Sequence, residues 1–187
     1  MEVDVTQLWL PILVSAVIVF IASSLVWMVL PHHKKDVKTL PDEKALTDHL
    51  QQLRIPPGMY MWPCCGSKED MKSEEFKAQF DAGPWGSLSI LGSKPNFGRN
   101  LVLIFIFYLV VSVFVAYITS LARGPGETFL HVFRVAGAVG VLAYCAGSIP
   151  GAIFFGKPGR FVLTELIDGI VYGLLTGVIF GLFWPGG

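Results

Sequence analysis

TELIDGIVYGLLTGVIFGLFW, residues 164–184, is the stretch that decides the fold, because glycine recurs in it at every fourth position. These glycines are Gly169, Gly173, Gly177 and Gly181. On an α-helix, positions four apart lie nearly above one another, so the glycines form one row without side chains. In water each would cost about 1 kcal/mol relative to alanine. In a bilayer the backbone must stay helical, and small residues let a second helix approach closely. The row therefore predicts a membrane helix packed against a partner.

The preceding apolar segment offers that partner. Ala143, Gly147 and Gly151 are also four apart, and Ala136 and Gly140 lie on an adjacent row. We expect the two segments to form a tight antiparallel pair through these small residues. The same glycine face could instead mediate self-association or line a pore, and the sequence leaves these alternatives open.

Composition places the chain among multi-pass membrane proteins. It has 187 residues, of which 53% are hydrophobic and 15% charged, which is too apolar for an ordinary soluble domain. Three runs of more than 20 residues, 8–30, 101–122 and 135–156, contain no charged residue and can span the hydrocarbon core. The fourth run, 161–184, spans it only if Asp168 lies at or inside the membrane boundary.

The fold class that follows is an all-α membrane protein of four transmembrane helices with a small α+β cytoplasmic insertion between the first two. We divide the chain into a first transmembrane helix (1–31), the insertion (32–98) and a three-helix transmembrane bundle (99–187). In the insertion, we expect helices after Asp42 and Ser73 and a strand pair, Met59–Trp62 with Ser87–Leu91. Its methionine and tryptophan side chains would form either a miniature core, which we favour, or a contact with the membrane or a partner.

The positive-inside rule predicts the orientation. Twelve of the fourteen lysines and arginines fall within residues 31–99 or 157–160. We therefore expect residues 32–98 in the cytoplasm and both termini in the periplasm, with the chain in a bacterial inner membrane.

Asp168 is the ionisable residue most expected to matter, because an acid at membrane depth needs a partner. We predict a buried charge pair with Arg99 at the start of the second span, with Arg160 as the second candidate. Such a pair would fix the second span against the fourth. A role for Asp168 in moving protons or ions is the alternative.

The sequence contains no constellation that indicates an enzyme. Cys64 and Cys65 are adjacent and lack the C-x2-C spacing of zinc sites, so with His32 and His33 they predict no metal site. No phosphate-binding glycine loop, nucleophile elbow or His-Glu-x-x-His motif occurs, so we assign no catalytic residue. The zero net charge does not favour nucleic acid as a partner. Cofactors stay unknown, because pigments, quinones and lipids bind apolar grooves without a motif.

Three segments carry a resemblance to a known group: LWLPIL (8–13), IPPGMYM (55–61) and IDGIVYGLLT (167–176). Together they resemble small uncharacterised bacterial membrane proteins with four helices. The resemblance implies the fold and the membrane location, and it implies no activity and no catalytic or binding residue.

We predict a non-enzymatic accessory or scaffold subunit of a larger membrane protein complex, with the lipid bilayer and other membrane subunits as partners. The prediction rests on abundant small-residue faces and on an insertion too small and too poor in motifs for catalysis. The alternative is a self-assembling small channel or transporter in which Asp168, Tyr172 and Thr176 line a path and a kink at Pro150 acts as the gate.

Overall fold

The computed structural model describes residues 3–186, which form two compact units. One unit, the helical bundle, contains residues 3–37 and 96–186, and the other, the insertion, contains residues 38–95. The predicted domain boundaries at 31–32 and 98–99 are therefore shifted by a few residues. The chain after the first span stays with the bundle up to Val37, and this short segment carries the candidate site described below.

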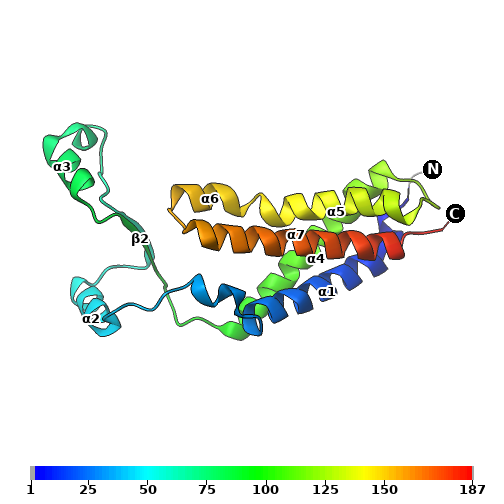
Figure 1. Cartoon of the computed structure of the whole chain (residues 1–187), viewed down its shortest axis with the longest axis horizontal. Coiled ribbons are helices and arrows are strands. Elements are labelled where there is room, and N and C mark those ends of the chain that lie inside the picture. The colour runs from blue at the N-terminus through cyan, green and yellow to red at the C-terminus, as the bar shows by residue number, and fades with distance from the viewer. Residues whose placement is uncertain (1–2, 187) are drawn as a thin grey trace. The chain divides into compact units, whose positions relative to one another are not determined.

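The bundle contains four helices long and apolar enough to cross a membrane: Val5–Met28, Phe97–Ala122, Phe129–Phe154 and Gly159–Leu182 (Figure 1). This confirms the expected four helices of membrane-spanning length and composition. Its elements are η1 (Val5–Leu8), α1 (Trp9–Met28), η2 (Pro31–Lys35), α4 (Phe97–Ala122), α5 (Phe129–Cys145), α6 (Ser148–Phe154) and α7 (Gly159–Leu182). α1 begins and α7 ends at the same end of the bundle, where Trp184 Nε1 donates to the Gly124 carbonyl at 2.9 Å.

The third span is broken into α5 and α6 at Ala146–Gly147. Pro150 accounts for the break, because proline has no N–H to donate to the carbonyl four residues earlier, and its ring crowds that carbonyl. The sequence predicted a kink at this point. Gly147 lies at this break, and a Cβ added to it would have no neighbouring atom within 4 Å.

The glycine row of α7 faces α5. A Cβ built on Gly169 would lie 2.7 Å from Cys145 Sγ, and one built on Gly177 would lie 2.8 Å from Gly137 Cα. Gly173 meets the backbone of Val141 and Gly181 meets Phe129, so α5 and α7 run antiparallel with backbones nearly in contact.

The structure corrects the partner row on α5. Gly140 and Gly137, rather than Ala143, Gly147 and Gly151, face the α7 glycines. Ala143 and Gly147 are exposed. The break at Ala146–Gly147 ends α5 before Gly147 and Gly151 could continue along α7, and Ala143, which lies within α5, is exposed.

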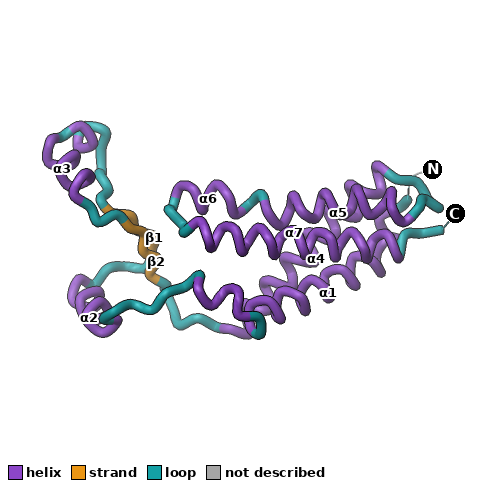
Figure 2. Tube along the Cα trace, viewed as in Figure 1, coloured by secondary structure: helices purple, strands orange, loops and turns teal. Residues whose placement is uncertain are grey.

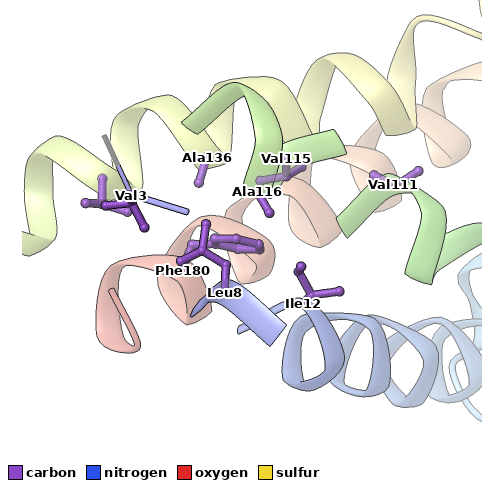
Figure 3. Close-up of a cluster of buried hydrophobic side chains, with 9 residues drawn as sticks. Val3, Leu8, Ile12, Val111, Val115, Ala116, Ala136 and Phe180 are labelled. Carbon is purple, nitrogen blue, oxygen red and sulfur yellow. The ribbon is translucent and has the colours of Figure 1, made fainter. Parts of the chain in front are cut away.

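The end of the bundle nearest the termini is filled by apolar side chains (Figure 3). Phe180 of α7 is fully buried there and packs with Leu8 before α1 and Val115 of α4. The remaining members of this apolar cluster are Val3, Ile12, Val111, Ala116, Val132 and Ala136. Close packing of these side chains contributes many small dispersion contacts.

The insertion contains α2 (Glu43–Leu53), β1 (Gly58–Trp62), η3 (Asp70–Lys72), α3 (Glu74–Ala82) and β2 (Gly86–Ile90). Asp42 and Ser73 cap α2 and α3 through hydrogen bonds to Ala45 N and Phe76 N. The strands pair antiparallel, with Tyr60 opposite Leu88, and are the orange segments in Figure 2. The predicted helices and strand pair are thus confirmed.

The expected miniature core in the insertion does not form. Every residue of 38–95 is exposed or only partly buried, and Met59, Met61 and Trp85 are 56%, 45% and 63% exposed. Two short helices and a two-stranded sheet do not enclose enough volume to bury these side chains.

Candidate functional site

The site begins with the turn that follows the first span. Pro31 opens η2, where its missing N–H costs nothing and its fixed φ suits the first helical position. The short helix packs against α7. It therefore brings His32 and His33, which directly follow the membrane helix in sequence, back onto the fourth span.

Both histidines reach the carboxylate of Asp168. His32 Nε2 lies 3.0 Å from Oδ1, and His33 Nε2 lies 2.7 Å from Oδ2. Asp168 is 5% exposed and His33 is 7% exposed. A carboxylate this deeply buried is costly without partners, and two imidazoles supply them.

This pairing corrects the predicted charge pair of Asp168 with Arg99. Within the described residues Arg99 forms no ion pair with Asp168, and it is exposed in the first turn of α4. The physical reason is that η2, rather than the start of α4, packs beside Asp168. Arg160, the second candidate, joins the site indirectly through Asp36.

A second carboxylate orients His33 from the other side. Asp36 Oδ2 lies 2.7 Å from His33 Nδ1 and accepts a 2.6 Å hydrogen bond from Thr164 Oγ1 of α7. Arg160 Nε lies 3.0 Å from Asp36 Oδ1, and an Arg160 guanidinium nitrogen donates to the His32 carbonyl at 2.8 Å. The hydrogen bond from Thr164 lowers the pKa of Asp36 below its ordinary value, assisted by His33 and Arg160 and opposed by burial.

Trp27, in the last turn of α1, covers the His33 ring. The two rings stack with centroids 3.8 Å apart and an interplanar angle of 7°. The stack leaves His33 little rotational freedom, because Asp36 and Asp168 hold its two nitrogens while Trp27 holds its face. The imidazole is thus fixed in orientation before any ligand binds.

The three groups have the composition of a metal site. His32 Nε2, His33 Nε2 and an Asp168 oxygen all lie within 4.8 Å of one another. Ligand atoms about 2.1 Å from a shared tetrahedral ion would stand about 3.4 Å apart, so small side-chain rotations bring them to that spacing. A metal-bound histidine commonly donates a hydrogen bond from its second ring nitrogen to a carboxylate. Asp36 is in position to accept that hydrogen bond from Nδ1 of His33.

A cleft of about 210 Å³ adjoins Asp168 inside the bundle. Tyr108, Tyr144 and Tyr172 line it. Their rings pack edge to face, with centroids 5.9 Å apart for Tyr108 and Tyr144 and 6.0 Å apart for Tyr144 and Tyr172. Tyr172 and Thr176, which the sequence analysis placed with Asp168 along a possible path, are both buried. Thr176 Oγ1 donates to the Tyr172 carbonyl at 2.9 Å, so that hydroxyl is satisfied within the helix.

Sequence reasoning missed His32 and His33 as partners of Asp168. It considered them with the cysteines of the insertion, and Cys64 and Cys65 form no part of this site. A usable signal was present, because the two histidines directly follow the first span on the membrane side where Asp168 was expected. Asp36 and Thr164 gave no comparable signal, since their pairing depends on the fold of η2.

Comparison of the chain with protein-family models, with characterised proteins and with solved structures finds no match.

Proposed function

We propose that this chain is a multi-pass membrane protein that binds one divalent transition-metal ion at the membrane border through His32, His33 and Asp168. The observation that carries the proposal is the convergence of three ligand atoms within 4.8 Å, with His33 oriented through its other nitrogen by Asp36. Two imidazoles and one carboxylate suit first-row ions such as Zn²⁺, Fe²⁺ or Co²⁺ rather than Ca²⁺ or Mg²⁺.

The neighbouring groups support a site that forms by exchanging protons for metal. With no ion bound, each short contact between imidazole and carboxylate is a hydrogen bond that contains one proton between nitrogen and oxygen. An ion binding at the two Nε2 atoms would displace those protons and leave Nδ1 of His33 as the donor to Asp36. Three protein ligands would leave a further coordination position for water or another small ligand.

We place this end of the bundle on the cytoplasmic face of a bacterial inner membrane, with both termini in the periplasm. Most lysines and arginines lie on this side by the positive-inside rule. The contact of Arg160 with the His32 carbonyl supports one common side for the two connecting loops. The proposed ion would then exchange with the cytoplasm.

The proposal is tested by metal titration of the purified, tag-free protein after chelator treatment. We expect one Zn²⁺ per chain by calorimetry, and visible absorption bands on adding Co²⁺. His33→Ala should abolish both signals. His131→Ala, at the opposite end of the bundle, is the matched control and should bind as wild type. Replacing both Cys64 and Cys65 by Ser removes the free thiols of the insertion as competing ligands.

Two results would overturn the proposal. One is the absence of binding by a folded protein, which would leave these residues as a hydrogen-bonded lock between η2 and α7. The other is equal affinity in wild type and His33→Ala.

We propose the accessory-subunit role as a second function, and the insertion supports it. Met59 and Met61 are exposed and lie two positions apart in β1, so their side chains are on the same face of the strand. A unit without buried residues gains stability by burying such side chains against another membrane subunit.

The test is the size of the complex extracted from native membranes in mild detergent. The double substitution Met59→Ser with Met61→Ser should reduce a large particle to the single chain, and Met71→Ser, at an equally exposed methionine outside the strand pair, should leave it intact. A single chain already in the wild type would argue against this role.

A further inference from the structure

Sulfur-bearing side chains are concentrated in one short segment of the insertion. Of the three cysteines and five methionines in the chain, two of each kind lie within residues 59–65. Cys64 is exposed, Cys65 is half-buried, and both are free thiols. Met59 and Met61 are 56% and 45% exposed on one face of β1, and the strand ends just before the cysteines. All four side chains are therefore accessible to a ligand that prefers sulfur.

The two adjacent thiols are poorly placed to form a disulfide with each other. Consecutive Cα atoms stand about 3.8 Å apart across a trans peptide, whereas the Cα atoms of bridged cysteines usually stand about 4.4–6.8 Å apart. The reducing cytoplasm, where we place the insertion, also keeps thiols reduced. The Cys64 side chain is turned along the chain, with its Sγ 3.8 Å from the Cys65 carbonyl oxygen. The pair is thus available as two thiol ligands on neighbouring positions.

The composition of the segment selects the kind of ion. Residues 58–67 contain no histidine, aspartate or glutamate, so the side chains there that commonly bind transition metals are thiols and thioethers. Zn²⁺ in structural sites takes four ligands from cysteine, histidine and carboxylate groups, and two adjacent cysteines do not complete such a set. Cu⁺ is a softer ion that is selected by thiolates and thioethers and is satisfied by fewer ligands.

From these features we infer that Cys64 and Cys65 bind one Cu⁺ ion, with a methionine thioether of β1 completing its coordination. Binding breaks two S–H bonds, forms two Cu–S bonds and releases two protons to solvent. The copper stays monovalent, so no electron is transferred. The inference concerns a different ion and different residues from the proposed metal site of the bundle, and it does not rest on that site. Because Met59 and Met61 would also serve the proposed subunit contact, the test uses the purified full chain.

The test is a titration of reduced, chelator-treated protein with Cu⁺ under anaerobic conditions, in competition with the Cu⁺ chelator bathocuproine disulfonate. We expect one Cu⁺ per chain to be withheld from the chelator, and X-ray absorption at the copper edge to show only sulfur neighbours. Replacing both Cys64 and Cys65 by Ser should abolish this binding. Both residues lie in a loop and are not part of a helix or strand, so the thermal unfolding of the copper-free protein should not change.

A second variant tests the thioether ligands. Met59→Leu with Met61→Leu keeps apolar side chains of similar size and removes both sulfur atoms from β1, so it should weaken Cu⁺ binding about tenfold. Met71→Leu, at a methionine outside β1 that is as exposed as Met59, is the matched control and should bind like the wild type.

Four results would each overturn the inference. The wild type could yield all its copper to the chelator, the serine variant could bind as wild type, or nitrogen or oxygen atoms could lie beside the copper. The fourth is equal affinity in the leucine variant and the wild type, because a pair of thiols without thioethers would then account for the binding. A failed Zn²⁺ titration of the bundle would leave these outcomes unaffected, since the two tests use different ions and different residues.

Discussion

Two neighbouring rows of α7 differ in how they find their partners. The glycine row, from Gly169 to Gly181, packs on α5, the preceding long helix of the chain. The polar row, Thr164, Asp168 and Tyr172, contacts residues from distant parts of the sequence, such as Asp36 and His33. The glycine row determines how closely two backbones approach, and the polar row carries the groups that can bind a ligand.

The difference shows that close packing and chemistry can share one helix without sharing residues. A glycine row needs only another smooth surface, which the adjacent antiparallel helix supplies. A buried carboxylate needs partners with particular geometry, and His32 and His33 of η2 supply them, with His33 held in place by the capping residue Asp36. Substitutions in the two rows should therefore damage different properties of the protein.

The largest effect is expected from Gly173→Ala in the glycine row. A Cβ there would lie 2.7 Å from Val141 Cα, and backbone atoms of a packed helix cannot move aside cheaply. We expect a loss of about 3 kcal/mol in the free energy of unfolding, at the upper end of overpacking effects. Thermal unfolding in detergent, followed by size-exclusion chromatography, measures it.

Gly147→Ala is the matched control, because nothing lies within 4 Å of a Cβ at that position. It should change the free energy of unfolding by less than about 0.5 kcal/mol. Equal stability of the two variants would contradict the assignment of Gly173 to the helix contact.

The glycine spacing and the uncharged runs were sufficient to predict the four spans and to expect that the last two pair. They were not sufficient to identify the contacting row on α5. Gly147 and Gly151 have the right spacing in sequence, but the break before Pro150 takes them out of register with α7. Spacing alone does not reveal where a helix is interrupted. Here the position of the interruption determined which of two rows of small residues could contact α7.

The next effect is a loss of metal affinity on Asp168→Asn in the polar row. The amide keeps the size of the side chain but removes the negative charge and one acceptor oxygen. We expect Zn²⁺ affinity to fall by more than about 100-fold, beyond what outer-shell substitutions cost. Calorimetric titration measures this.

Glu165→Gln, three residues earlier on the same helix, is the control and should bind Zn²⁺ like the wild type. Parallel losses in both variants would mean that negative charge at this end of α7 matters and that the specific ligand does not.

A smaller effect is expected from Asp36→Asn. Asp36 would not contact the ion itself but would hydrogen-bond to its ligand His33. The amide can accept from His33 Nδ1 but does not carry the charge that increases the basicity of the ring. We expect Zn²⁺ affinity to fall about tenfold, with one ion still bound per chain. If Asp36→Asn lost binding completely, Asp36 would itself be a ligand.

The site could be predicted from the sequence only in part. Asp168 was identified from its depth, because a charge inside the membrane requires a partner. Its partner was wrongly assigned to Arg99, which was expected at the same membrane face, because the short helix that lies beside Asp168 was not foreseen. His32 and His33 reach Asp168 because Pro31 starts a short helix that folds back onto α7, and that turn has no sequence signature beyond the proline.

The smallest effect is expected from Glu127→Gln, at the opposite end of the bundle from Asp168, where neither row of α7 is involved. A hydrogen bond with His131 lowers the pKa of Glu127 below its ordinary value, with the Thr128 N–H and Arg123 contributing. A lowered pKa in the folded state means that the charged carboxylate stabilises the protein above about pH 4.3, and that this contribution disappears as the pH falls through the folded-state pKa. The pairs are partly exposed, so wild type and variant should differ in melting temperature by no more than about 2 °C at pH 7 and converge below pH 3. A difference of about 6 °C or more at pH 7, which corresponds to about 3 kcal/mol, would mean that this loop contributes to stability as much as the glycine row does, and the contrast between the rows of α7 and the rest of the bundle would then fail.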